Sequence, residues 1–420
     1  MRKAKNIFDN IDGLSILLYS LLVLFGIINI YASQYNDDST FMLDLSSRYG
    51  KQIFFSGISF FVGFIILIID WKFFYSMTYI FYSLTILLLI GVLFQGAITG
   101  GASSWFELGL FKFQPSEFAK FITALALAKY YNNINSKSIS FRDRLKVYAI
   151  IIIPFLLIIL QNDLGTAIVF SAFILVLYRE GLSGNILIFG LIIATLFALT
   201  LLIEKTILIS IISSIVLIVI IIYKKTKKNI FALLTIFTLI VSFIFSVDYI
   251  FNNVLAPHQR ARVNIYLGID IDPHGAGYNL IQSKIAIGSG GVTGKGYLNG
   301  TQTRFDFVPE QSTDFIFCTI GEEWGFLGSV IFISSFIGLL LRLLFLAERQ
   351  RSNFSRIYGY SVATILFLHF FINIGMTIGL MPTIGIPLPF ISYGGSSLMG
   401  FTVLVFIFLN LDSYRLQILR

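Results

Sequence analysis

The sequence predicts an all-α polytopic membrane protein, and three observations support that prediction. The 420-residue chain is 56% hydrophobic and 12% charged, whereas a soluble domain contains about 25% charged residues. Its mean hydropathy is +0.85. Its apolar runs extend for roughly 20 residues without alternation, which matches a membrane-spanning helix and differs from a β-barrel strand. Because only helices and closed barrels satisfy their backbone groups in lipid, we expect a bundle of transmembrane helices.

Twelve apolar runs are predicted to span the membrane. The first, 14–32, is too long for the core of a signal peptide and is therefore expected to remain in the protein. The other eleven cover residues 52–70, 73–95, 116–131, 147–161, 163–179, 184–203, 207–223, 230–252, 314–346, 355–380 and 396–412. The Ile-rich pair at 184–203 and 207–223 has almost no polar residue beyond Glu204 and Lys205, so we expect a structural hairpin.

The distribution of positive charge predicts the topology. With the N-terminus placed in the cytoplasm, 20 of the 30 lysine and arginine residues fall on the inner side, which is the positive-inside bias of membrane proteins. Both termini are then cytoplasmic, and residues 256–313 form a large extracytoplasmic loop within a single integral membrane domain of residues 1–420. The net charge of +8 reflects this topology, so no nucleic-acid partner is expected.

The loop at 256–313 is predicted to be folded and functional. Nine of the 34 glycines lie between Gly268 and Gly300, and long loops in compact proteins are usually either functional or disordered. Short apolar periods within it favour a folded loop. The glycine run at 288–296 is not a phosphate-binding P-loop, because Ser289 and Gly296 occupy positions that need glycine and Ser or Thr.

Cysteine and histidine give no metal pattern. The single cysteine, Cys318, lies in an apolar run, and the three histidines, His258, His274 and His369, are far apart in the sequence. Neither a disulfide framework nor a zinc site is therefore predicted, and the histidines are interpreted as ordinary loop or core residues.

Charged residues at membrane depth are better markers of a site, because each costs roughly 2.5 kcal/mol or more unless it faces a cavity or a partner. Glu117 and Lys120 are three residues apart and share a helix face; they either form an internal ion pair or line a substrate cavity. Asp163 either caps the next helix or faces the same cavity. Asp314 raises the same choice between helix capping and function.

Two further features are unusual for a transmembrane region. Glu322 and Glu323 are adjacent acids deep in a predicted span, and the spacing of Gly321 and Gly325 suits a close contact that would shield them from lipid. The segment 381–397 has prolines at 382, 387 and 389, so it cannot be regular helix. It is either an ordinary tight loop or the wall of a pocket.

Together these motifs resemble the SEDS family (shape, elongation, division and sporulation), membrane enzymes that polymerise lipid II into glycan strands of peptidoglycan. The resemblance covers nearly the whole chain. It rests on QPSE at 114–117, DLGT at 163–166, residues 272–278, QSKIAIGSGG at 282–291, TDFIF at 313–317 and SYGGSS at 392–397. Residues 294–302 and 385–390 look like the elongation member of the family rather than the division member.

Three features depart from the family pattern. Ser312 stands where the family usually has histidine, and Asn162 stands where it usually has proline. Members usually have ten spans, so the resemblance implies a bundle of ten core helices plus the extra hairpin at 184–223.

The resemblance implies inverting glycosyl transfer, with undecaprenyl pyrophosphate as the leaving group and Asp314 as the general base. Glu117, Lys120 and Asp163 would line the cavity, and Glu310, four residues before Asp314, is a further candidate for substrate binding. The cations that would hold the pyrophosphate are Arg260, Arg262, Lys284, Lys295 and Arg304. No nucleotide is needed, and a divalent cation beside the pyrophosphate stays open.

The same resemblance implies a bacterial cytoplasmic membrane, a class B penicillin-binding protein as transpeptidase partner, and other membrane proteins of the elongation complex. Two alternatives from other classes stay open. A lipid II flippase or transporter would also use intramembrane charges and proline-broken segments, and a scaffold would perform no chemistry.

Overall fold

The computed structural model describes residues 10–35, 45–99, 102–108, 111–134, 140–223, 227–255, 257–267, 277–305 and 307–416. It confirms the predicted all-α membrane fold, since nine helices within these residues are long and apolar enough to cross a membrane. The chain divides into two compact units. Unit 1 comprises Met1–Leu177 and Asn279–Arg420, and unit 2 comprises Tyr178–Tyr278.

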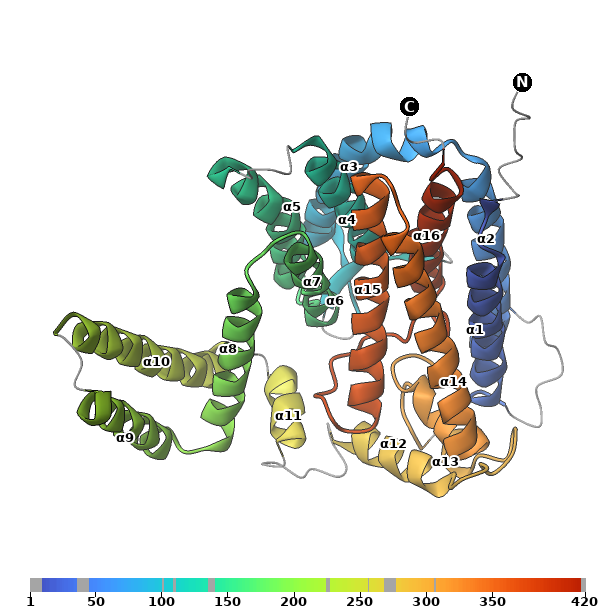
Figure 1. The fold of residues 1–420 in the computed structure, drawn as a ribbon. Helices are drawn as coiled ribbons and strands as arrows, with labels where there is room; N and C mark the ends of the chain where they lie inside the picture. Colours follow the sequence, from blue (N-terminus) through green and yellow to red (C-terminus); the bar gives the residue numbers. More distant parts are fainter. Residues whose placement is uncertain are drawn as a thin grey trace. The chain divides into compact units, whose positions relative to one another are not determined.

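Unit 1 contains most of the helices (Figure 1). They are α1 (Gly13–Ala32), α2 (Arg48–Ile68), α3 (Trp71–Gln95), α4 (Pro115–Asn133), α5 (Phe141–Leu160), α6 (Leu164–Val169), α7 (Ala172–Arg179, at the boundary), α12 (Tyr278–Ser289), α13 (Thr301–Arg304), α14 (Ile316–Glu348), α15 (Asn353–Thr377) and α16 (Gly395–Ser413). Unit 2 contains α8 (Gly184–Leu202), α9 (Lys205–Tyr223), α10 (Lys227–Asn253) and α11 (Pro257–Tyr266).

All twelve predicted spans fall on helices, with two differences in detail. The span at 163–179 is divided into the short helices α6 and α7. The span at 314–346 is kinked at Gly325, whose φ of 65° is not helical. Polar side chains set several helix starts: Asp12, Ser47 and Asp163 each accept a backbone N–H from the first turn of α1, α2 and α6, as N-cap residues do.

The core of unit 1 lies around α15 and α16. α16 packs against α2, and α15 packs against both α4 and α14. Glycines permit the closest approaches: a Cβ on Gly63 would overlap the ring of Phe406, and one on Gly359 would overlap Phe408. Small residues at such contacts are typical of helix packing in membranes.

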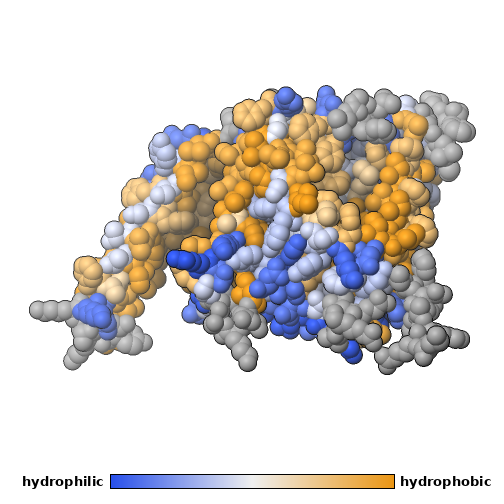
Figure 2. Space-filling view, turned by 90° about the horizontal axis from the view of Figure 1, so that it is seen from above, coloured by the Kyte–Doolittle hydropathy of each residue, from blue (hydrophilic) through white to orange (hydrophobic). Residues whose placement is uncertain are grey.

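The two ends of unit 1 differ in character. The start of α1 and the end of α16 lie at one end, and α12 and α13 lie at the other (Figure 1). At the first end, Arg342 binds Asp12, and Arg349 binds the buried Asp412. Figure 2 views the molecule from above and shows hydrophilic residues collected on part of that face, next to broad hydrophobic areas.

A small antiparallel sheet between α3 and α4 was not expected from the sequence. It comprises β1 (Ala97–Thr99), β2 (Ala102–Leu108) and β3 (Phe111–Phe113), in the order β1-β2-β3. Phe106 pairs with Phe113 across β2 and β3.

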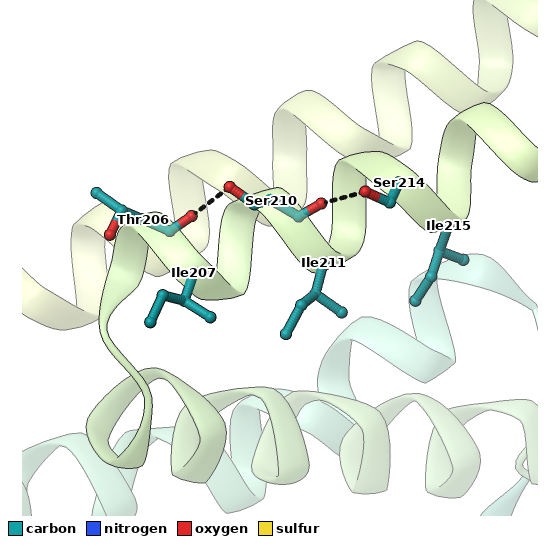
Figure 3. Close-up of a pocket in the computed structure, with 6 residues that line it drawn as sticks. All are labelled: Thr206, Ile207, Ser210, Ile211, Ser214 and Ile215. Atoms are coloured by element: carbon teal, nitrogen blue, oxygen red, sulfur yellow. Dashed lines mark hydrogen bonds between the residues drawn. The ribbon is translucent and has the colours of Figure 1, made fainter.

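In unit 2, α8, α9 and α10 pack against one another, and Lys205 pairs with Asp248 at 2.9 Å. A hollow lies along α9 (Figure 3). Its isoleucines line one side, and the hydroxyl groups of Ser210 and Ser214 donate to carbonyl oxygens of their own helix at 2.8 Å. The hollow has no titratable side chain in its lining, so it offers no acid–base chemistry.

Candidate active site

The proline-rich segment, defined here as residues 381–394, is an irregular stretch between α15 and α16. Proline has no N–H, so such a segment cannot be held by a regular backbone ladder. Side chains hold it instead: Asn373 Nδ2 donates to the carbonyl oxygen of Ile386 at 2.7 Å, and Leu388 N donates to Ser392 Oγ at 2.8 Å. The segment therefore has a fixed conformation and is more than a tight loop that joins two helices.

Asp314 lies against this segment. The N-cap position of α14 falls on Phe315 and not on Asp314. The main-chain oxygen of Asp314 accepts a hydrogen bond from Asn373 Nδ2 at 2.8 Å, and its Oδ2 lies 3.3 Å from the point where a Cβ of Gly385 would stand. The Asp314 side chain is only partly buried. The carboxylate therefore lies where the start of α14 meets the proline-rich segment.

The turn before Asp314 is tied to the same segment and to α2. Tyr393 N donates to the main-chain oxygen of Ser312 at 2.8 Å. The first residue of α2, Arg48, donates from Nη1 to Ser312 Oγ at 2.8 Å and lies 3.5 Å from Glu310 Oε2. Burial raises the pKa of Tyr393, and the charge of Arg48 opposes the rise only in part, so its phenol is protonated at neutral pH.

Arg48 is a site residue that the sequence analysis missed. Its side chain is 43% exposed and bonds to Ser312, two residues before Asp314 in the chain. The available signal was its predicted position on the outer side of the membrane, against the positive-inside bias.

Asp163 caps α6 and accepts four hydrogen bonds. Its carboxylate oxygens accept from Thr166 N at 3.0 Å, Thr166 Oγ1 at 2.9 Å, Gln114 Nε2 at 2.9 Å and Ser116 Oγ at 3.3 Å. The structure thus shows the capping role, and it adds a tie to the start of α4. With its acceptor sites occupied in this way, Asp163 is suited to holding elements together.

The start of α6 also abuts the proline-rich segment. A Cβ on Gly165 would lie 3.1 Å from the carbonyl oxygen of Gly385. The helix that Asp163 caps and the carboxylate of Asp314 therefore both lie against Gly385.

Glu117 and Lys120 form an internal ion pair. Lys120 Nζ lies 2.8 Å from Glu117 Oε2, and both side chains are 3% exposed. The same Nζ lies 2.9 Å from His369 Nε2 and 4.7 Å from the centre of the Phe401 ring. Because the pair is closed to solvent, it can act on a substrate only through its neighbours.

The five predicted pyrophosphate ligands have different surroundings. Lys284 is on α12, and its Cδ lies 3.3 Å from the point where a Cβ of Gly379, just after α15, would stand. Lys295 binds the buried Glu322 at 2.6 Å, and Arg304 stacks on Tyr35 at 5.7 Å. Arg260 and Arg262 lie on α11 in unit 2; Arg260 stacks on Phe251 at 5.8 Å, and the side chain of Arg262 lies outside the described residues.

Glu322 explains how adjacent acids are tolerated within α14. Besides Lys295, its carboxylate accepts from the backbone N–H groups of Thr301, Gln302 and Thr303 at 2.8 to 2.9 Å. The glycines permit close contact with α12 and the loop after it: a Cβ on Gly321 would lie 2.9 Å from the Ile287 side chain, and one on Gly325 would lie 2.2 Å from Gly294 N. Within the described residues, no group of three or more His, Cys, Asp and Glu side chains is arranged to hold a metal ion.

The fold and this site define a class: a polytopic membrane protein with a partly exposed carboxylate held where the start of α14 meets the proline-rich segment. The family model FTSW_RODA_SPOVE, described as "Cell cycle protein", matches residues 12–209 and 186–417. The chain belongs to this family, as the motif resemblance predicted. The two matched ranges overlap at residues 186–209, within the predicted extra hairpin that α8 and α9 form.

Two relatives illustrate the similarity. The peptidoglycan glycosyltransferase MrdB of Escherichia coli (strain K12) is 36% identical over 319 residues, which are 76% of this chain and 73% of the relative. The peptidoglycan glycosyltransferase RodA of Treponema pallidum (strain Nichols) is 34% identical over 413 residues, which are 93% of this chain and 94% of the relative.

Solved structures agree. A chain from "Structural coordination of polymerization and crosslinking by a peptidoglycan synthase complex" is 27% identical, with a TM-score of 0.70, covering 97% of this chain and 99% of that chain. Rod shape determining protein RodA of Thermus thermophilus is 23% identical, with a TM-score of 0.63, covering 96% and 97%. The second similarity concerns the fold alone.

Proposed function

We propose that this chain polymerises lipid II into the glycan strands of peptidoglycan during cell elongation, with Asp314 as the general base. The activity class is that of its relatives: the chain is a peptidoglycan glycosyltransferase and a multi-pass membrane protein. The observation that carries the assignment of Asp314 is its geometry. The carboxylate is partly exposed, lies against Gly385, and is fixed at its main chain by Asn373.

The proposed reaction transfers a glycan chain from undecaprenyl pyrophosphate to lipid II. A free sugar hydroxyl of one lipid II attacks the anomeric carbon of a glycan chain linked to undecaprenyl pyrophosphate, and Asp314 accepts the hydroxyl proton. A glycosidic C–O bond forms with inversion, and the bond to the pyrophosphate oxygen breaks with its electron pair on the leaving group. A positioned general base contributes typically about 10²- to 10⁴-fold to such a step.

The leaving pyrophosphate needs positive charge. Lys284 and Arg48 fit this role best: Lys284 of α12 reaches toward Gly379, just after α15, and Arg48 adjoins the turn that carries Asp314 and is held only by a long, exposed pairing with Glu310 at 3.5 Å. Lys295 is instead assigned to the loop, since a buried carboxylate holds it. Arg260, Arg262 and Arg304 remain candidates from the sequence alone.

The other predicted site residues are assigned to support. Glu117 and Lys120 are buried, and the Asp163 carboxylate accepts four hydrogen bonds that tie α6 to the start of α4, so we assign them to the wall of the site and not to contact with the sugar. Glu310 stands beside Arg48 and orients it. We propose no resident cofactor, because the lipid pyrophosphate already activates the sugar; polymerisation with and without divalent cations tests whether the pyrophosphate itself requires one.

We further propose the bacterial cytoplasmic membrane as the location, with both termini in the cytoplasm. This agrees with the positive-inside bias and with arginines at the end of unit 1 opposite α12 and α13. A class B penicillin-binding protein is the proposed partner, together with other elongation-complex membrane proteins, because the relative in the peptidoglycan synthase complex has the same fold. No nucleic-acid partner is proposed.

The test is glycan-strand formation from purified lipid II by Asp314→Asn in complex with its cognate transpeptidase. We expect a loss of about 10²-fold or more, with unchanged folding and partner binding. Asp248→Asn is the control, because it removes a carboxylate from an exposed pair in unit 2. Normal polymerisation by Asp314→Asn would show that the base is another group, and reorientation of lipid II in liposomes without any glycan product would favour the transporter alternative.

A further inference from the structure

His369 is a buried residue that the function described so far does not use. It lies on α15, is 1% exposed, and packs edge-to-face on Phe401 with the ring centres 4.7 Å apart. Its Nε2 lies 2.9 Å from Lys120 Nζ, and its Nδ1 lies 3.3 Å from the carbonyl oxygen of Pro387.

These two contacts define the roles of the ring nitrogens. A lysine ammonium has donors only, and Glu117 holds Lys120 in that form through a contact of 2.8 Å. Nε2 of His369 must therefore accept, so the ring proton lies on Nδ1 and is donated to the Pro387 carbonyl. The imidazole thus joins a buried ion pair to the backbone of the proline-rich segment.

Asn373 lies one helical turn after His369 and faces the same way. It donates to the carbonyl oxygen of Ile386 at 2.7 Å and to that of Asp314 at 2.8 Å. The two α15 side chains therefore hold the consecutive carbonyls of Ile386 and Pro387. The residue just before them, Gly385, is the one against which the Asp314 carboxylate lies.

We propose that His369 is a positioning residue for the transfer reaction: by bridging Lys120 and the Pro387 carbonyl, it fixes the backbone that sets the place of the Asp314 carboxylate. This inference rests on the proposed function of Asp314. The bridge matters because the prolines at 387 and 389 have no N–H, so the segment cannot form a regular backbone ladder, and the carbonyls of Ile386 and Pro387 are held by side chains of α15 instead. It also connects the buried pair of Glu117 and Lys120 to the site without contact between that pair and the substrate.

The test compares three substitutions of His369: one removes both contacts of the bridge, and each of the other two keeps one of them. His369→Phe removes both hydrogen bonds, His369→Asn keeps a donor near the position of Nδ1, and His369→Gln keeps an acceptor near the position of Nε2. Steady-state polymerisation of purified lipid II is measured for each variant in complex with the transpeptidase, together with the thermal midpoint.

We expect kcat of His369→Phe to fall by about tenfold to a hundredfold, as for a small misplacement of a catalytic group, with KM for lipid II changed less than about twofold. His369→Asn should recover most of kcat, and His369→Gln should not. A purely structural role would lower all rates in proportion to the folded fraction. Ser361→Ala is the control, because this buried hydroxyl of α15 bonds only to the carbonyl of Ile357.

The inference is overturned if His369→Phe and His369→Asn have the same kcat, or if KM rises while kcat is unchanged. Recovery of kcat by His369→Gln alone would also overturn the inference. The contact that matters would then be the one between Nε2 and Lys120 and not the one between Nδ1 and the Pro387 carbonyl. If His369→Phe does not fold, the comparison of His369→Asn with His369→Gln still decides. Asp314→Asn in the same assay separates the two claims: an active Asp314→Asn refutes the proposed base, whereas an inactive one with an insensitive His369 series refutes only the positioning role.

Discussion

At the scale of the residue, substitution of Arg48 should change substrate binding and leave thermal stability unchanged. Its contacts with Ser312 and Glu310 are partly exposed, and exposed ion pairs typically contribute about 0–1 kcal/mol to stability. We therefore expect Arg48→Ala to leave the thermal midpoint nearly unchanged and to raise KM for lipid II by about tenfold, the effect of one lost charged contact of about 1.4 kcal/mol. Steady-state polymerisation at several lipid II concentrations measures this.

A matched control is available on the small sheet. Lys112 pairs with Glu107 at 3.0 Å, and both side chains are about half exposed, as at Arg48. Lys112→Ala should change neither KM nor the thermal midpoint. An equal rise of KM in both variants would mean that the effect comes from net charge on the external side and not from a contact made by Arg48.

The sequence predicted Asp314 but not its setting, and the reason is physical. A carboxylate at the start of an apolar run is visible in a sequence as a costly charge. The groups that fix it, Asn373 and Gly385, are uncharged and lie 59 and 71 positions later, so no local pattern connects them to it. Glu117, Lys120 and Asp163 were likewise visible as charges, whereas their partners, among them His369 and Gln114, appear only in three dimensions.

At the scale of the element, the conformation of the proline-rich segment depends on glycine. Gly385 has φ +79°, a region that costs other residues roughly 1–2 kcal/mol. Gly385→Ala would add that strain and place a Cβ 3.3 Å from Asp314 Oδ2. We expect kcat to fall by about tenfold or more, since a small displacement of the carboxylate is enough, together with a modest loss of thermal stability.

Gly181→Ala provides the comparison for that substitution. Gly181 has φ +102°, so it also lies in the left-handed region of backbone conformation, but nothing lies within 4 Å of the point where its Cβ would stand. Both variants should lose similar stability, and only Gly385→Ala should lose most of its activity in the polymerisation assay. Equal losses of activity would mean that backbone strain alone, and not the contact with Asp314, limits the rate.

The long helices could be predicted from the sequence because the length and hydropathy of the apolar runs determine them. The breaks between and within these helices could not be predicted in this way. The kink at Gly325 depends on the loop that packs against it through Gly294, and the sheet at residues 97–113 depends on pairing between short strands. Both are tertiary effects that a hydropathy window does not detect. The division at residues 169–172 is similarly invisible in a continuous apolar run.

At the scale of the whole molecule, the family match and the structure agree on a bundle of helices. Residues near each end of the chain are held to other helices of this bundle by ion pairs. Asp12 at the start of α1 binds Arg342 of α14, 330 residues later. Asp412 of α16 accepts from Arg349, Gln350 and Arg415. None of these contacts involves Asp314 or the residues that hold it, so their loss should affect stability and not the chemistry.

The stability that the Asp12 carboxylate contributes should depend on pH. Burial alone would raise the pKa of Asp12, but hydrogen bonds from Arg342 and Ser15 outweigh it and lower the pKa from 3.8 to about 2. The folded state therefore favours the ionised carboxylate. The stabilisation is complete above about pH 4 and is lost as the pH falls toward 2. At neutral pH we expect Asp12→Asn to cost about 1–3 kcal/mol, the value of hydrogen bonds to a charged group, with unchanged kcat per folded molecule.

Thermal midpoints of the wild type and Asp12→Asn, measured in one detergent from pH 7 to pH 3, test this. The gap between them should be constant above about pH 5 and should narrow as the wild-type carboxylate begins to protonate. Asp248→Asn, which breaks an exposed pair with Lys205, should show little difference at any pH. A gap for Asp12→Asn that is as wide at pH 3 as at pH 7 would mean that the shape of the side chain, and not its charge, holds α1 to α14.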